Sequence, residues 1–396
     1  MAAADPIAPT TTRALRVLAL AYFVQATGAL SVVGALAAIS AEWGLSDALS
    51  ASLVSVFGVT FALAAPTLQV LLGHLERRRQ VLLGLTLFSA AALLLAAAPG
   101  YEVMLVARVL MGLGAAFIGP VLGALGSGLV PAAQQGSAIA MVLLGLSVAG
   151  LVGMPLSAWL AHVAGARGLF LAVAVAGALT ALLVRAWVPR GVAGHRVRAA
   201  DLLAMLVQPR WISGFLVAFF MSASVYTTYT FLVPILRDVF HAEPSLVSVA
   251  LAVLGVAGIL GNLVVTRAAR RYSSERMLIA GMLLLALDLP LLWLAAPHLA
   301  PLWVGLALWA FATDLLWPSQ QRRIVEMDPG LRGLSLSLTA SFVFLGIGAG
   351  AAAGGVIYPH WGYAGLLLTT LGGLVLAALS LAVSSVGAPR PGAQPA

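Results

Sequence analysis

Residues 99–131 read PGYEVMLVARVLMGLGAAFIGPVLGALGSGLVP, and residues 297–329 read PHLAPLWVGLALWAFATDLLWPSQQRRIVEMDP. Their prolines coincide, since Pro99, Pro120 and Pro131 recur half of the 396-residue chain later. The recurring prolines are Pro297, Pro318 and Pro329, and further pairs at nearly the same offset are Arg79 and Arg276, Gly136 and Gly333, and Gly165 and Gly362. The chain is therefore a duplication. A duplicated membrane unit is typical of transporters whose halves rock about a central site.

The composition is that of a membrane protein. Hydrophobic residues make up 62% of the chain and charged residues 9%, with a mean hydropathy of +1.05, whereas soluble chains carry about 25% charge. A spanning helix needs about 20 apolar residues, so twelve of them use roughly 240 and leave short loops. We expect an all-α integral membrane protein with twelve transmembrane helices as two pseudo-symmetric six-helix bundles.

The apolar stretches give the expected helix ranges. They are 14–39, 48–73, 80–98, 101–127, 133–162, 167–187, 210–236, 245–266, 277–296, 301–320, 333–357 and 362–384. The longest internal connection is polar and basic, and it joins the first six predicted helices to the last six. It divides the chain into an N-terminal six-helix bundle at 1–187, a cytoplasmic linker at 188–209 and a C-terminal six-helix bundle at 210–396.

The arginines predict the orientation. All 21 basic residues are arginine, and all but Arg108, Arg167 and Arg237 fall on one side of the predicted topology. The positive-inside rule makes that side, which holds both termini, cytoplasmic. The arginines lie in short loops, in every second loop along the chain, and this distribution argues against a nucleic-acid partner. The chain has no cysteine, which excludes a disulfide framework, a thiol nucleophile and a thiolate metal site.

Two segments carry recognisable motifs, LVARVLMGLGAAFIGP in helix 101–127 and GLSVAGLVGMPLSAWLAHVAGARGLF from helix 133–162 onward. They resemble the major facilitator superfamily, in particular its twelve-helix drug/proton antiporter branch with the arabinose- and sugar-efflux-type permeases. The resemblance implies a monomer in the bacterial cytoplasmic (inner) membrane that handles a small-molecule substrate and protons in the lipid bilayer without a cofactor. The matching positions are Arg108, Gly112, Gly114, Ala116, Gly145, Gly150, Gly153, Pro155, Gly165, Arg167 and Phe170.

One signature of the family is incomplete. The family pattern between the second and third helices is Gly-x-x-x-Asp-Arg-x-Gly-Arg-Arg, and here the stretch reads VLLGHLERRRQ. Arg78 and Arg79 match the final basic pair, but His74 stands in place of the aspartate and Val70 in place of the first glycine. The charged latch to which that aspartate normally belongs is therefore in question.

Three charged residues lie deep in the predicted membrane region, where charge is costly and usually functional. Asp314 is the first candidate for proton coupling, because the resemblance places its helix at the central cavity. Its alternative is a permanently paired or permanently protonated carboxyl. The resemblance implicates Arg108 in proton coupling. The alternative is a structural role, in which its guanidinium bonds backbone carbonyls or extends toward the outer membrane surface. Asp288 has the alternative of bonding backbone freed by Pro290.

The substrate-binding candidates lie mainly on helix 210–236. Ser222, Tyr226 and Tyr229 share one helical face, and Thr230 adds a hydroxyl beside them. Hydroxyls and rings on a cavity helix suit a polar or amphipathic organic substrate, whereas the alternative is hydrogen bonding and packing between helices. Further candidates by the same reasoning are Gln25, Thr27 and Trp309.

Small residues recur every four positions in the fifth and eleventh helices. Such spacing lets helices approach closely, and in a rocking transporter the same contacts could permit sliding. The expected packing or gating positions are Gly145, Gly150, Gly153, Pro155, Gly346, Gly350 and Gly354.

These features predict a secondary active transporter that exports a small organic solute by alternating access, with proton antiport. A facilitator or a proton symporter for a small metabolite is the alternative, and a polytopic membrane enzyme is a remote one. An enzyme needs a chemical cluster at one membrane depth, which the sequence does not show, so we expect no enzymatic activity. No Walker motif is present, and the histidines lack metal-ligand spacing, so we expect neither direct ATP drive nor a metal site.

Overall fold

The computed structural model describes residues 8–131, 134–194, 197–268, 271–327 and 332–385, and the regular structure in these ranges is helical. The first half holds α1 (Pro9–Trp43), α2 (Asp47–Leu72), α3 (Arg77–Ala96), α4 (Tyr101–Ser127), α5 (Gln135–Val148), a π-helical turn (Ala149–Gly153) and α6 (Met154–Trp187). The second half holds α8 (Pro209–Tyr229), α9 (Leu232–Asp238), α10 (Pro244–Ala268), α11 (Ser274–Ala295), α12 (Leu299–Met327) and α13 (Arg332–Ser385), and α7 (Ala199–Val207) lies between the halves.

The expected twelve passes are confirmed. Among the described residues, nine helical stretches are long and apolar enough to cross a membrane, and two of them, Ser137–Trp187 and Leu334–Ser385, have 51 and 52 residues. Each of these holds two passes, because the backbone turns at Gly165 (φ 73°) and at Gly362 (φ 60°). Left-handed φ values favour glycine, which explains why this pair recurs in both halves of the sequence. With α10 the passes number twelve.

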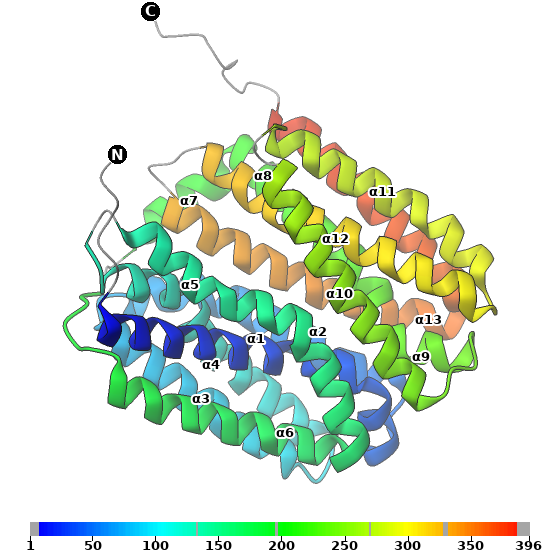
Figure 1. The fold of residues 1–396 in the computed structure, drawn as a ribbon, viewed down its shortest axis with the longest axis horizontal. Coiled ribbons are helices and arrows are strands. Elements are labelled where there is room, and N and C mark those ends of the chain that lie inside the picture. The colour runs from blue at the N-terminus through cyan, green and yellow to red at the C-terminus, as the bar shows by residue number, and fades with distance from the viewer. Residues whose placement is uncertain (1–7, 132–133, 195–196, 269–270, 328–331, 386–396) are drawn as a thin grey trace, which may run out of the picture.

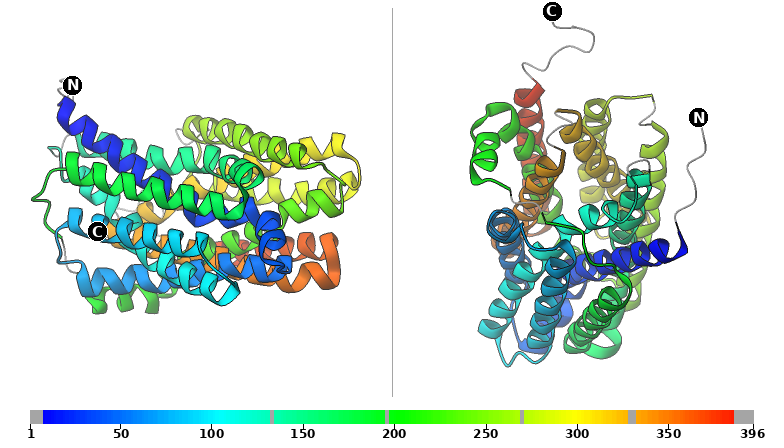
Figure 2. Two further views of the ribbon diagram at one scale, coloured as in Figure 1. Left: turned by 90° about the horizontal axis from the view of Figure 1, so that it is seen from below. Right: turned by 90° about the vertical axis from the view of Figure 1, so that its left-hand side faces the viewer.

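The two bundles lie side by side with their helices running in the same general direction (Figure 1). Both termini are at one end, as the left view of Figure 2 shows, and we call this the terminal end and the opposite one the far end. Inside each bundle most of the buried side chains are apolar, and most of these belong to one continuous core. The polar groups of functional interest are therefore exceptions within an apolar interior.

Three local features differ from the expectations. Helix α1 begins at Pro9 rather than near residue 14, and the expected linker contains α7. The seventh pass is not one helix, because α8 ends at Tyr229 and α9 starts at Leu232. Pro234 explains the break, since proline lacks an N–H and its ring clashes with the carbonyl four residues earlier, that of Thr230.

Equivalent glycine seams hold the first and fifth passes of each half together. In the first half Gly145 lies against the carbonyl of Ala19 on α1, and Gly153 faces Thr27. In the second half Gly346, Gly350 and Gly354 lie against carbonyls of Phe219, Ala223 and Thr227 on α8. A Cβ at Gly354 would stand 2.7 Å from the Thr227 oxygen, closer than side chains tolerate. Glycine is required here by close approach of the two backbones.

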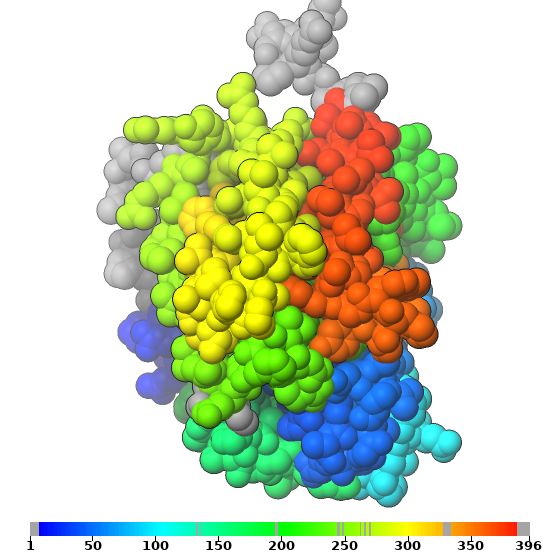
Figure 3. All heavy atoms as spheres, turned by 90° about the vertical axis from the view of Figure 1, so that its right-hand side faces the viewer, coloured from blue at the N-terminus to red at the C-terminus, as the bar shows by residue number. Residues whose placement is uncertain are grey.

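The halves meet mainly along α2 and α13. Gly348 faces the Ser55 carbonyl, and nearer the far end Gly355 faces Ala48. The π-helical turn supplies a second contact, where Gly255 of α10 lies against the Leu151 carbonyl. Seen from the far end, atoms of the α1–α2 turn, of α9 and of the bend in α13 lie together (Figure 3). The two bundles are thus in contact at the far end.

Candidate functional site

Arg108 is fully buried in α4 and is held by backbone carbonyls. Its Nε donates to the Leu53 oxygen at 2.9 Å, and its Nη atoms donate to the oxygens of Gly28 (3.3 Å) and Ala29 (2.9 Å). Its guanidinium lies 4.5 Å from the centre of the Phe57 ring. The group thus joins α1, α2 and α4, and the interaction with carbonyls matches the structural alternative considered for this residue.

Asp314 lies half-buried near the middle of α12, against two glycines of α10. Its carboxylate occupies the space that a side chain at Gly258 would fill, and its Cβ would stand 3.0 Å from a Cβ at Gly261. Among the described residues it has no hydrogen bond or ion pair. An uncompensated carboxylate at this depth is costly in its charged form, so the site can bind a proton or a cation.

Two aromatic side chains of α8 lie within electrostatic range of this carboxylate, without a hydrogen bond to it among the described residues. The rings of Tyr226 and Tyr229 meet edge to face with centroids 5.7 Å apart, and the charge of Asp314 acts on Tyr229. Tyr229 and Trp309 line one small, partly open cavity of about 20 Å³. The structure therefore brings together four predicted residues, Tyr226, Tyr229, Trp309 and Asp314, which we call the α8–α12 cluster.

The other predicted polar residues do not join this cluster. Ser222 donates to the Ala218 oxygen at 2.6 Å and faces the glycine seam at Gly346. Thr27 faces the equivalent seam at Gly153. Its hydroxyl, like that of Thr230, is buried without a hydrogen-bond partner among the described residues.

Gln25 is 2% exposed and lies on α1 near Gly119, with its Oε1 3.8 Å from the position of a Cβ there. It belongs to the first half.

Asp288 is 2% exposed in α11, and neither carboxylate oxygen has a hydrogen-bond partner in the described part of the chain. The backbone bond that we considered as its alternative role, next to Pro290, is therefore not formed. A Cβ at Gly305 of α12 would stand 3.6 Å from its Oδ1. Tyr363 of α13 interacts with it electrostatically.

The predicted glycines divide into two groups. All except Gly150 lie in close contacts, which are with the Thr27 side chain for Gly153 and with backbone for the others, and a Cβ at Gly150 would meet nothing within 4 Å. Pro155 follows the π-helical turn and has no N–H for the carbonyl of Leu151. That carbonyl faces Gly255 of the other half, and π-helical turns often mark functional positions.

Sequence reasoning missed an ion pair that joins the halves at the far end. Arg237 of α9 donates to Asp47 of α2 at 2.9 Å and to Asp238 at 2.6 Å. Ser40 donates to Asp47 at 2.7 Å, and Tyr358 donates to Asp238 at 3.1 Å. A signal was present, because Arg237 is one of the few arginines outside the basic side of the predicted topology.

The incomplete signature loop also makes contacts that the sequence did not reveal. Glu76 accepts the backbone N–H of Gly191 at 2.9 Å and pairs with Arg79 at 3.4 Å. Arg77 donates to the Ala193 oxygen at 3.2 Å. This acid therefore fastens the stretch after α6 to the loop between α2 and α3.

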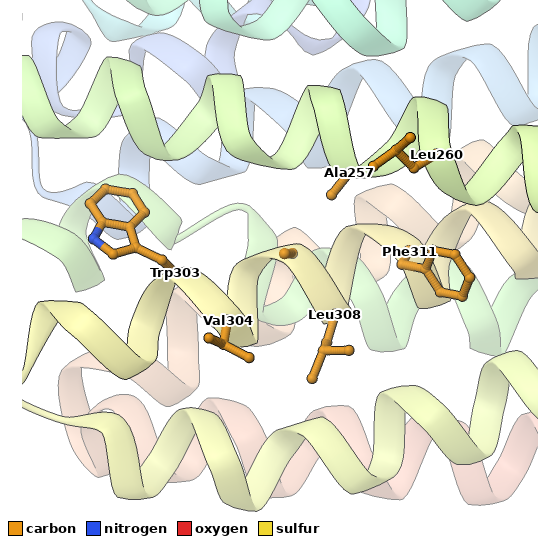
Figure 4. Close-up of a pocket in the computed structure, with 7 residues that line it drawn as sticks. Ala257, Leu260, Trp303, Val304, Leu308 and Phe311 are labelled. Carbon is orange, nitrogen blue, oxygen red and sulfur yellow. The ribbon is translucent and has the colours of Figure 1, made fainter.

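An apolar groove of about 440 Å³ lies between α10 and α12. Figure 4 shows its lining, in which Trp303, Val304, Leu308 and Phe311 come from α12 and Ala257 and Leu260 from α10. The groove has an apolar lining throughout. It lies next to the α8–α12 cluster, since Phe311 precedes Asp314 by one helical turn.

Comparison with known proteins identifies the family. The family model described as Major Facilitator Superfamily matches residues 18–287 and residues 214–396. The chain belongs to this superfamily. It is 32% identical over 375 residues to "Inner membrane transport protein YdhP" of Escherichia coli, which covers 93% of this chain and 94% of the relative. It is 26% identical over 364 residues to "Uncharacterized MFS-type transporter YbcL" of Bacillus subtilis, covering 92% and 93%.

Solved structures agree on the fold. A bacterial homologue of the human lysosomal transporter Spinster, crystallised in an inward-facing and unoccupied conformation, matches with a TM-score of 0.76 at 18% identity, over 96% of this chain and 97% of that one. The nucleoside transporter NupG matches with a TM-score of 0.70 at 15% identity, over 94% and 98%. The family and its members indicate membrane transport rather than enzymatic catalysis.

Proposed function

We propose that this superfamily member is a secondary active transporter that exports a small organic solute by alternating access in exchange for protons. The observation that carries the proposal is the carboxylate of Asp314, which has no ion pair among the described residues and packs against Gly258 and Gly261 of α10. Such a group can gain or lose a proton without breaking a salt bridge. Proton and solute can then compete for it, which couples their movements.

The chemistry of the α8–α12 cluster supports an amphipathic, preferably cationic, substrate. Tyr226, Tyr229 and Trp309 supply aromatic surface next to one acid. Aromatic faces attract organic cations, and the attraction strengthens when the site is desolvated. A neutral sugar would not need the carboxylate, so substrate charge distinguishes these classes.

The arginine distribution supports placing the terminal end in the cytoplasm of a bacterial cell. The far end then faces outward, and its contacts between the halves correspond to a state closed to the outside. In this cycle an outer proton neutralises Asp314 and releases the solute outward. A ligand shifts such an equilibrium only by its differential affinity for the two states.

Transport by reconstituted protein tests the proposal. A screen over lipophilic cations, nucleosides, amino acids and sugars first identifies a transported solute. Solute moving down its gradient should then drive protons the opposite way in wild-type proteoliposomes, and Asp314→Asn should abolish that proton movement. Normal coupling in Asp314→Asn would contradict the proton assignment. Proton movement in the same direction as the solute would indicate a symporter, and transport without proton movement would indicate a facilitator.

A further inference from the structure

The apolar groove between α10 and α12 has no part in the transport cycle proposed above. Its volume of about 440 Å³ lies within the range of small-molecule sites, about 300–1,000 Å³. Its rim is open and apolar (Figure 4), because Val304 of α12 is 55% exposed and Leu260 of α10 is 56% exposed. A groove of this kind suits an apolar ligand.

The groove lies on the outer side of α12. Its lining residue Phe311 is two positions from Trp309, which places the two side chains about 160° apart around the helix. Trp309 lines the small cavity together with Tyr229 of α8. The groove therefore opens away from α8. Exposed apolar side chains on that side suit contact with the hydrocarbon of the membrane.

The same face of α12 leads from the groove to an acid. Positions separated by four, four and three residues lie on one face of a helix, and this spacing relates Trp303, Ala307, Phe311 and Asp314. The first three line the groove, and Asp314 is the next residue on the face. The groove thus runs toward the acid near the middle of α12.

On α10 two glycines lie where the groove ends and the acid begins. Gly258 and Gly261 each directly follow a residue that lines the groove. A Cβ at Gly261 would stand 3.1 Å from the Phe311 oxygen and 3.0 Å from the Asp314 Cβ. At Gly258 the carboxylate itself takes the space of a side chain. At these two positions α10 therefore places no side chain between Phe311 and Asp314.

Charge decides what the groove binds. Asp314 is half-buried and has no ion pair among the described residues. A carboxylate within a membrane is costly unless it is protonated or paired, so a ligand that neutralises it gains affinity. A molecule with an apolar body and a positive charge meets both requirements. A phospholipid chain would fill the groove but brings no positive charge to Asp314.

We propose that the groove binds the apolar body of a lipophilic organic cation whose charge pairs with Asp314, and that this cation enters from the hydrocarbon of the membrane between α10 and α12. The inference deepens the proposed function. It rests on the role of Asp314 there, and it adds the class of substrate and the side from which the substrate enters.

Binding of tetraphenylphosphonium to the purified protein in lipid nanodiscs tests the groove. Ala307→Trp fills the groove two helical turns from Asp314, so it should weaken binding by about tenfold or more, the cost of leaving two methylene groups unburied. Ala307→Leu fills less of the groove and serves if Ala307→Trp does not fold.

Ala252→Trp is the matched control for this measurement. Ala252 is exposed on α10 outside the groove and, like Ala307, lies eight residues after the start of its helix. Its binding should equal that of wild type. Equal binding by Ala252→Trp and Ala307→Trp, or no binding by wild type, would overturn the proposal.

Tryptophan fluorescence tests the side of entry. In nanodiscs whose acyl chains carry bromine, wild type should show a component of quenching that Trp303→Phe lacks, because Trp303 lines the open groove. Tetraphenylphosphonium should reduce this component as it displaces the brominated chain. Absence of the component would contradict entry from the hydrocarbon. Quenching that persists at saturating tetraphenylphosphonium would show that a lipid chain alone fills the groove.

The variant Asp314→Asn separates this inference from the proposed function. It should weaken tetraphenylphosphonium binding, and unchanged binding would contradict the charge pairing. If Asp314→Asn keeps normal proton coupling, the proposed function fails, while the loss of binding in Ala307→Trp still decides whether the groove holds the cation. If Asp314→Asn loses coupling but Ala307→Trp binds like Ala252→Trp, the proposed function stands and the groove has no part in it.

Discussion

Arg108 and Asp314 are both charged residues in the membrane region, but only Arg108 has partners in the described part of the chain that compensate its charge. Arg108 is surrounded by carbonyl oxygens of Leu53, Gly28 and Ala29, which compensate its charge. Asp314 has no such partner among the described residues. Removing the partners of a compensated buried charge is strongly destabilising, whereas an uncompensated charge is available to a ligand.

Replacing Arg108 by lysine should destabilise the protein. An ammonium group cannot reach three carbonyls from two helices or lie flat over the Phe57 ring. Since hydrogen bonds of charged groups contribute about 1.5–3 kcal/mol each, the loss should be about 2–4 kcal/mol. Thermal unfolding in detergent measures it. Unchanged stability together with lost proton coupling would instead assign Arg108 to the proton path.

The substitution Gly258→Ala should impair proton-coupled transport, as Asp314→Asn should. The added methyl would occupy the place of the Asp314 carboxylate, while alanine itself favours a helix by about 1 kcal/mol. Gly372→Ala is the matched control, because a Cβ there meets nothing within 4 Å. Solute efflux from proteoliposomes is the measurement. Equal activity of the two variants would show that the position of the carboxylate is unimportant.

At the scale of helices, the sequence predicted which elements exist better than which faces meet. The recurring pair Gly165 and Gly362 marks equivalent turns, because both positions require a conformation that favours glycine. Helical periodicity also placed Tyr226 and Tyr229 correctly beside each other. It could not tell that Ser222 faces α13, because a shared face does not reveal which neighbour covers it. Pro234 signals that the helix breaks, but the sequence alone does not show that the break falls directly after Tyr229.

The glycine seams give a prediction at this scale. Gly350→Ala should push α13 away from the Ala223 carbonyl of α8 and destabilise the second half by about 1–3 kcal/mol. Gly150→Ala, from the matching pass of the first half, should be neutral or slightly stabilising, because its Cβ meets nothing within 4 Å. Thermal unfolding of both variants compares them directly. A larger loss for Gly150→Ala would contradict the assignment of the seam.

For the whole molecule, the duplicated sequence yields two bundles that are unequal in chemistry. The first carries the compensated Arg108, and the second carries Asp288, Asp314 and the aromatic side chains of the α8–α12 cluster. The contact between the bundles could not be predicted from the sequence. It depends on residues far apart in the chain, such as Asp47 with Arg237 and Ala48 with Gly355.

The most direct test of alternating access joins α2 to α13 at the far end. A Cβ at Gly355 would stand 3.6 Å from that of Ala48, a separation that suits a disulfide, and the natural chain has no cysteine to interfere. The double variant Ala48→Cys, Gly355→Cys should cross-link on oxidation and stop solute transport in proteoliposomes. Reductant should restore transport, and each single variant should transport throughout. Undiminished transport by the fully cross-linked protein would contradict the separation of the two halves at the far end.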